Sequence, residues 1–250
     1  MAADFSIGAI IWQSILTLRR NLIVFVGISC AFVVVSIVGR MGVDAILARE
    51  ESTVAANLLG AVVNLAVSYL ATAALVQPTV EDLAGGRPRL DRIIRRLPTS
   101  LGAAAVPAVL MGIGVLGGLS FFIIPGLFLA TLWYVAIPSA VVEGHAGAGA
   151  LRRSTQLTDG RRWQVFSLLI AVSVLVLSVM LASSVLIGAS AQAGARIFPL
   201  VVLVLAQGVV GAFGAVTATV CYHDLRALRE GASSALMLRE LNRRPPAGHE

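Results

Sequence analysis

The chain has 250 residues, of which 58% are hydrophobic and only 13% are charged, and its mean hydropathy is +0.90. Soluble globular domains contain about a quarter charged residues, so this chain has too few charges to cover a water-facing surface of normal size. The composition therefore excludes a soluble enzyme and an intrinsically disordered protein. A membrane protein remains, and its 19 basic residues, all arginine, give it a formal net charge of +6.

The first apolar stretch, Phe5–Leu18, is too short to cross a bilayer. It contains Trp12 and ends at Arg19 and Arg20, a pattern typical of an amphipathic helix in the headgroup region. The arginine pair follows the apolar residues instead of preceding them, which does not fit a secretory signal peptide. We therefore expect residues 1–20 to form an interfacial amphipathic segment.

Six long runs without Asp, Glu, Lys, Arg or His follow, each long enough for a membrane-spanning helix. They are Asn21–Val38, Ser52–Val80, Pro98–Gly118, Phe121–Val142, Gln164–Ile187 and Phe198–Tyr222. The turn between the third and fourth runs is indicated only by two Gly residues, Gly117 and Gly118, and by Pro125. The sequence predicts an all-α, polytopic integral membrane protein with a six-helix domain at residues 21–231. A polar tail at 232–250, disordered from Arg239 onward, completes the chain.

The arginines are distributed unevenly between the two sides that these six spans define. Three lie on one side, at Arg40, Arg49 and Arg196. Sixteen lie on the other, at Arg19, Arg20, Arg87, Arg89, Arg92, Arg95, Arg96, Arg152, Arg153, Arg161, Arg162, Arg226, Arg229, Arg239, Arg243 and Arg244. The positive-inside rule places the arginine-rich side and both termini in the cytoplasm. We expect a multi-pass protein of a bacterial cytoplasmic (inner) membrane.

Arginine pairs also precede each odd-numbered span. These pairs are Arg19 and Arg20, Arg95 and Arg96, and Arg161 and Arg162. Two explanations fit this spacing: three repeated units, each an interfacial helix followed by a helical hairpin, or the positive-inside rule alone. We favour the second explanation.

Small residues within the spans predict close packing of helices. Gly112, Gly114 and Gly117 match the spacing of a dinucleotide-binding loop, but that loop follows a strand and needs a later acidic residue on the ribose. Here the motif lies inside a spanning run, where glycines let two helix backbones approach. Gly208, Gly211 and Gly214 predict a second such face.

Asn57 and Asn64 lie on one face of the second span, together with Ser68. We expect both amides to form hydrogen bonds across the bundle, because an unpaired amide in lipid is costly. A transport path is the alternative.

Three prolines, Pro107, Pro125 and Pro138, are predicted to break the third and fourth helices, as broken helices do at the sites of many transporters. No ionisable residue lies inside the spans, which argues against an ion-coupled pump but not against a lipidic ligand.

The sequence contains no recognisable catalytic motif. Its three histidines do not form HExxH, and the thiols of Cys30 and Cys221 are expected to be inert and buried. His223 beside Asp224 could bind a metal or act as a base, but with Tyr222 it fits a membrane boundary better. Aromatic belts are expected at Trp163 and Tyr222 on one side, and at Phe121 and Phe122 on the other. We expect no enzyme activity, no cofactor and no metal.

Arg92, Arg95 and Arg96 recur at helical spacing, with Leu90, Ile93, Ile94 and Leu97 on the other face. Such a helix would lie on the membrane and contact anionic headgroups. The residues expected to contact lipid or a partner protein are Arg19, Arg20, Arg92, Arg95, Arg96, Arg152, Arg153, Arg161 and Arg162. No motif for nucleic-acid binding accompanies the basic charge.

The C-terminal half has further sequence features in common with a known family. They are Pro125, Gly126, Trp133, Pro138, Glu143, Gly144, Leu151, Arg153, Ser154, Leu157, Thr158, Gly160, Trp163, Tyr222, Asp224, Leu225, Arg226, Glu230 and Gly231. In these residues the chain resembles the bacterial membrane proteins that include the YciC-like inner-membrane proteins and the membrane domain fused to some glycerophosphodiester phosphodiesterases. The resemblance implies a six-helix inner-membrane domain. It implies no catalysis, because the phosphodiesterase of the fused relatives is a separate soluble barrel.

These patterns favour a non-catalytic protein that organises the membrane or serves as an accessory subunit. It would contact anionic lipids, and another membrane protein or complex, through its cytoplasmic arginines. The alternative is a carrier for a lipid or another hydrophobic solute, built on the proline-broken helices and the Asn57 and Asn64 face.

Overall fold

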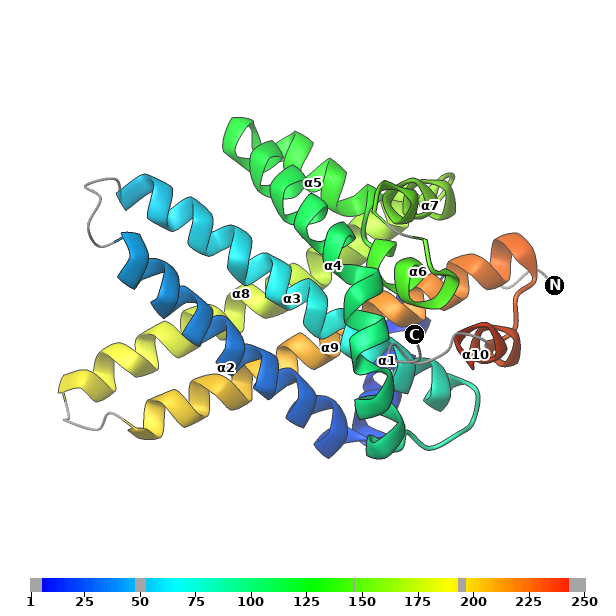
Figure 1. Cartoon of the computed structure of the whole chain (residues 1–250), viewed down its shortest axis with the longest axis horizontal. Coiled ribbons are helices and arrows are strands. Elements are labelled where there is room, and N and C mark those ends of the chain that lie inside the picture. The colour runs from blue at the N-terminus through cyan, green and yellow to red at the C-terminus, as the bar shows by residue number, and fades with distance from the viewer. Residues whose placement is uncertain (1–5, 48–52, 146, 193–196, 243–250) are drawn as a thin grey trace, which may run out of the picture.

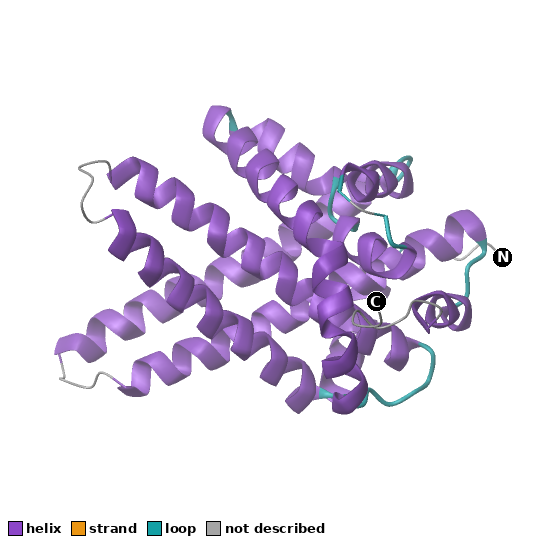
Figure 2. Cartoon of the chain, viewed as in Figure 1, coloured by secondary structure: helices purple, strands orange, loops and turns teal. Residues whose placement is uncertain are grey.

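The computed structural model describes residues 6–47, 53–145, 147–192 and 197–242, and within these ranges the regular structure is entirely helical (Figure 2). The helices are α1 (Ile7–Arg20), α2 (Leu22–Leu47), α3 (Thr53–Leu83), α4 (Leu90–Phe121), α5 (Ile123–Leu132), α6 (Ala136–Glu143), α7 (Ala148–Thr158), α8 (Arg162–Gln192), α9 (Ile197–Glu230) and α10 (Ser234–Asn242). Six stretches are long and apolar enough to cross a membrane: Leu22–Ile46, Asn57–Leu83, Leu90–Ser120, Ile123–Glu143, Arg162–Ala189 and Ile197–Glu230. The predicted all-α fold with six spanning helices is confirmed.

The long helices form three hairpins, α2 with α3, α4 with α5, and α8 with α9 (Figure 1). The hairpins pack together at one end and diverge toward the other. The shorter helices α1, α6, α7 and α10 gather around the packed end, which we call the compact end (Figure 1). Most of the buried side chains lie there, whereas the diverging parts of the hairpins expose large apolar side chains such as Ile46, Val185 and Ile197.

Most of the spanning helices are longer than the uncharged runs that predicted them. The helix α9 has 34 residues, which at 1.5 Å per residue gives a length of about 51 Å. The hydrocarbon core of a bilayer is only about 30 Å thick, so α9 must extend beyond it. Its charged C-terminal turns lie at the compact end, which therefore includes protein outside the apolar layer.

The predicted boundary between the third and fourth spans is close to the observed one. The chain turns at Phe122, whose backbone is extended, with φ −156° and ψ 143°. Two glycines allow the close approach that follows: a Cβ added at Gly118 would lie 2.8 Å from the Cα of Gly126. The prediction that Pro107 breaks the third span is wrong. The helix α4 continues through both Pro98 and Pro107.

The interruption in this hairpin lies in the fourth span, between α5 and α6. Val135 has non-helical φ and ψ, and the Leu132 carbonyl accepts a hydrogen bond from Ser154 Oγ of α7 at 2.7 Å. Pro125 and Pro138 are each the third residue of a helix, α5 and α6 respectively. The first turn of a helix leaves its N–H groups unpaired, so proline is tolerated there. Both prolines thus begin helices and do not kink them.

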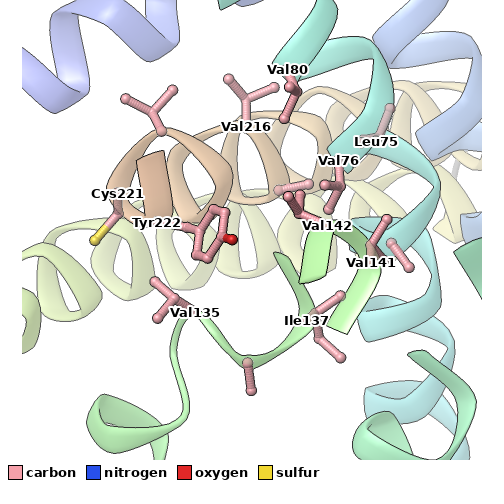
Figure 3. Close-up of a cluster of buried hydrophobic side chains, with 14 of the residues drawn as sticks. Leu75, Val76, Val80, Val135, Ile137, Val141, Val142, Val216, Cys221 and Tyr222 are labelled. Carbon is pink, nitrogen blue, oxygen red and sulfur yellow. The ribbon is translucent and has the colours of Figure 1, made fainter. Parts of the chain in front are cut away.

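The core at the compact end forms where α3, α6 and α9 meet (Figure 3). Residues 73–82 of α3 are all buried, as are residues 136–142 of α6. Tyr222 of α9 is fully buried and its ring lies among Val135, Val142 and their neighbours (Figure 3). The sequence predicted Tyr222 to be part of an aromatic belt, but its burial excludes that position. Trp163, the other predicted member of the belt, is 80% exposed at the start of α8.

Two amphipathic helices cover this core. In α1, Ile10 and Leu18 are buried, and the helix packs mainly on α9, while Trp12 on the opposite face is 63% exposed. In α10, Met237 and Leu241 are buried and the helix packs against α3 and α6. Residues 234–242 of the expected polar tail are thus a docked helix, and residues 243–250 lie outside the described residues.

Candidate functional site

The described arginines, apart from Arg40, all lie at the compact end. Arg40 lies near the far end of the α2–α3 hairpin, where its Nε is 3.1 Å from Asp44 Oδ1. Its Nη2 donates to Asn57 Oδ1 at 2.9 Å. Asn57 thus pairs with an arginine from the neighbouring helix, and not with a group across the bundle.

An ion-pair network centred on Arg226 joins the C-terminal helix to the bundle. The Arg226 side chain is 8% exposed and forms a two-pronged contact with Glu240 of α10, with distances of 2.6 and 2.9 Å from Nη1 and Nη2. Its Nε donates to Glu230 Oε2 at 3.0 Å. Bidentate Arg–carboxylate pairs fix geometry strongly, so this contact holds α10 against α9.

Glu143, at the end of α6, extends the same network to α7. Its Oε1 accepts a hydrogen bond from the Tyr222 hydroxyl at 2.7 Å, and its Oε2 accepts one from Arg153 Nε at 2.7 Å. Arg153 also donates to Glu230 Oε1 at 2.5 Å. Burial disfavours the charge on Arg153, but the hydrogen bonds that it donates to Glu230 and Glu143 outweigh this cost and raise the pKa of its guanidinium. Arg153 is therefore charged throughout the physiological range and has carboxylate partners within the chain.

A second group of contacts connects α3, α4 and α10. Glu81 is 2% exposed, and its Oε1 accepts hydrogen bonds from Gln77 Nε2 and Arg92 Nη1, each at 3.2 Å. Arg96 Nη1 donates to the Leu241 carbonyl of α10 at 2.5 Å. Arg95, by contrast, is exposed and pairs with Asp91 one turn earlier at 3.0 Å.

These contacts change the interpretation of residues 90–97. The segment is not a separate helix on the membrane surface but the first turns of α4, continuous with the third span. Ile93 is buried at 4% exposure, while Ile94 is 66% exposed. Arg92 and Arg96 thus face the protein, and of the three arginines only Arg95 extends into the surroundings.

The remaining predicted arginines lie on the surface of the compact end. Among the described residues, Arg19, Arg152 and Arg161 have no side-chain hydrogen bond or ion pair. Arg20 Nη1 lies 3.9 Å from Asp82 Oδ2, and Arg162 Nη2 lies 3.1 Å from Asp159 Oδ1, both with exposed guanidinium groups. Arg19 and Arg152 are exposed and Arg161 is partly exposed. We call these three arginines, Arg19, Arg152 and Arg161, the exposed arginine set. Two exposed tryptophans lie near members of this set: Trp12 is on α1 with Arg19, and Trp163 follows Arg161 by two residues at the start of α8.

Two amides away from the ends of the spans have no side-chain hydrogen bond to any described residue. Asn64, which was expected to pair across the bundle, is exposed on α3. Gln207 of α9 is half-buried, one residue before Gly208, whose close approach to Cys30 leaves no room for a Cβ. Sequence reasoning overlooked Gln207, although a lone amide between apolar residues of a span was a visible signal.

His223 connects α9 to α10. Its Nδ1 lies 3.2 Å from Asp224 Oδ1 and its Nε2 lies 2.8 Å from Ser234 Oγ. Both ring nitrogens are therefore occupied within the chain. No cluster of three or more His, Cys, Asp or Glu side chains that could hold a metal ion occurs in the part of the chain that the structure describes.

Comparison of the chain with models of known protein families, with curated proteins and with solved structures gives no match. The resemblance of the C-terminal half to the YciC-like membrane proteins therefore stays a prediction.

Proposed function

We propose that this protein is a non-catalytic, multi-pass protein of a bacterial inner membrane that gathers anionic lipids around its compact end. In this proposal the compact end faces the cytoplasm, as the positive-inside rule requires of an arginine-rich end. The lipid-contacting groups are the exposed arginine set. A partner protein that binds the same surface would make the chain an accessory subunit.

One observation supports this proposal above the others. Two groups of arginines at the compact end differ in their partners: Arg92, Arg96, Arg153 and Arg226 are paired within the chain, whereas the exposed arginine set has no side-chain partner among the described residues. An arginine near an anionic membrane surface contributes about 1 kcal/mol of attraction. The set thus has charges to offer to a lipid headgroup, and the internal pairs do not.

The exposed tryptophans support the same placement. Trp12 is 63% exposed and Trp163 is 80% exposed, although both are large side chains at the compact end. Tryptophan is enriched where the hydrocarbon core meets the headgroups, because its ring is apolar and its N–H is polar. The arginines beside them would then lie at headgroup depth.

The test replaces Arg19, Arg152 and Arg161 together by Gln and identifies the lipids that remain with the purified protein by mass spectrometry. We expect the anionic fraction of these lipids to fall, by up to about fivefold for each arginine removed. Replacing the same three residues by Lys is the matched control, because lysine keeps the charge and should retain the anionic lipids. An unchanged anionic fraction in the Gln variant would contradict the proposal.

A carrier for a lipid or another hydrophobic solute is the second candidate. It is favoured by the exposed amide of Asn64, which has no hydrogen bond to the described residues although it lies within a span. The triple Gln variant separates the two candidates. A carrier keeps the Asn64 face and should still move lipid between the leaflets of a vesicle, whereas a lipid-organising protein loses its bound anionic lipids.

A further inference from the structure

A cavity of about 240 Å³ lies between α1 and the end of α3, beside the point where the chain leaves the spans. Gln13, Leu16, Thr17 and Arg20 of α1 line one side, and Asp82, Leu83 and Gly85 line the other. One water molecule occupies about 30 Å³ in the liquid, so this space can accept a small polar group. Its walls combine a carboxylate, a guanidinium, an amide and a hydroxyl with two leucines.

The carboxylate of Asp82 is only partly satisfied by the protein. The residue is 7% exposed, and its Oδ1 accepts a hydrogen bond from Asn21 Nδ2 at 2.7 Å. Its Oδ2 has no hydrogen bond to the described residues, and Arg20 Nη1 lies 3.9 Å away from it. A buried carboxylate oxygen without a donor is costly, so a ligand that supplies N–H groups is favoured there.

The charges of the cavity select the chemical class of that ligand. The Asp82 carboxylate attracts a cation and repels a phosphate, whereas the Arg20 side chain, 65% exposed and able to reorient, can bind a phosphate at the mouth. A group with an ammonium and a phosphate two methylene units apart meets both requirements. A primary ammonium supplies three N–H donors, but the quaternary ammonium of choline supplies none.

The surroundings of the cavity favour a membrane lipid over a soluble molecule. On the same helix, Trp12 is 63% exposed and Ile15 is 41% exposed, so α1 presents apolar side chains outward. An amphipathic helix of this kind lies at the depth of the headgroups. We propose that the cavity between α1 and α3 binds the headgroup of an ethanolamine phospholipid, with the ammonium on Asp82 Oδ2 and the phosphate on Arg20.

The test measures, by native mass spectrometry of the full-length protein, the binding of phosphatidylethanolamine, phosphatidylcholine and phosphatidylglycerol with identical acyl chains. We expect phosphatidylethanolamine to bind about tenfold more tightly than the other two, because only its headgroup donates N–H groups to the carboxylate. Asp82→Asn removes the charge but keeps the oxygen that accepts from Asn21, and it should abolish this preference. Asp91→Asn, at an exposed carboxylate of α4, is the matched control and should retain it.

Two further measurements keep the test decisive. Arg20→Gln changes an exposed side chain and should weaken phosphatidylethanolamine binding about fivefold even if Asp82→Asn does not fold. Soluble phosphoethanolamine should bind more weakly than the lipid, and equal binding would assign the site to a free headgroup. Equal binding of the three lipids, or a preference that Asp82→Asn leaves intact, would overturn the proposal. None of these variants changes the exposed arginine set, so this site and the proposed anionic-lipid surface can fail separately.

Discussion

At the scale of single residues, the arginines of the compact end differ in what surrounds them. Arg226 and Arg153 share the carboxylate of Glu230, and each has another acidic partner on a neighbouring helix. Arg152, next to Arg153 in the chain, is exposed and has no side-chain partner among the described residues. Adjacent arginines thus have different roles, one in holding helices together and one at the surface.

This difference predicts the effect of replacing Arg226 by Gln. The change removes the buried cation shared by Glu240 and Glu230, whose side chains are 32% and 36% exposed. Because water can solvate these carboxylates in part, we expect a cost of about 1–3 kcal/mol, below that of a fully buried pair. We expect a clearly lower midpoint when the purified protein is unfolded thermally in lipid nanodiscs. Arg152→Gln is the control and should change the stability by less than about 0.5 kcal/mol. Equal midpoints for the two variants would show that the network does not stabilise the fold.

At the scale of helices, glycines set how closely the hairpins pack. Gly118 of α4 approaches Gly126 of α5, and Gly208 of α9 approaches Cys30 of α2, each without space for a Cβ. Gly117, the immediate neighbour of Gly118, has nothing within 4 Å of the corresponding position. The approach of two helix backbones therefore depends on one glycine of the pair and not on the other.

Alanine substitutions at these two adjacent glycines should therefore have different effects on the free energy of unfolding. Gly118→Ala forces the α4–α5 hairpin apart and is expected to destabilise the protein by about 1–3 kcal/mol. Gly117→Ala adds a methyl group in open space and should leave the stability unchanged or raise it by up to about 1 kcal/mol. Unfolding in increasing concentrations of a denaturing detergent measures both. A Gly118→Ala variant as stable as Gly117→Ala would argue against the close approach.

The sequence was sufficient to locate the spans but not their interruptions. Uncharged runs define where the six helices lie, because charge is excluded from the hydrocarbon layer. They do not show that Pro107 is accommodated within α4. The prolines did predict a break in the fourth span near Pro138, but its position at residues 133–135 involves a contact between Leu132 and Ser154 of α7 that the sequence does not reveal. Charged residues ended the predicted runs too early, since helices such as α9 continue beyond the bilayer core.

The candidate site was predictable only in part, for a related reason. Arginine positions are visible in a sequence, but their partners lie on other helices: Arg226 of α9 pairs with Glu240 of α10, and Arg96 of α4 donates to the Leu241 carbonyl, 145 residues away. Replacing Arg92, Arg95 and Arg96, which the sequence predicted to contact lipid, would therefore disturb internal contacts as well. Tyr222 was misplaced for the same reason, because its partner Glu143 lies at the end of another span.

At the scale of the whole molecule, three helical hairpins share one packed end. The helices α1 and α7 each precede a hairpin, whereas the helical turns before the second hairpin are continuous with α4. The arrangement resembles the three-unit repeat that the arginine pairs suggested, with its second interfacial helix merged into a span. Positive charge is concentrated at the packed end, because the described arginines other than Arg40 lie at the compact end.

The central claim is that this compact, arginine-rich end faces the cytoplasm and the inner leaflet. Alkaline phosphatase, which is active only outside the cytoplasm, tests this claim most directly when it is fused after Gly86 and, separately, after Arg49. Gly86 lies in the turn between α3 and α4 at the compact end, whereas α2 ends at Leu47 on the opposite side, two residues before Arg49 in the sequence. We predict an inactive fusion after Gly86 and an active one after Arg49. The reverse pattern would place the arginines outside the cell and contradict the account.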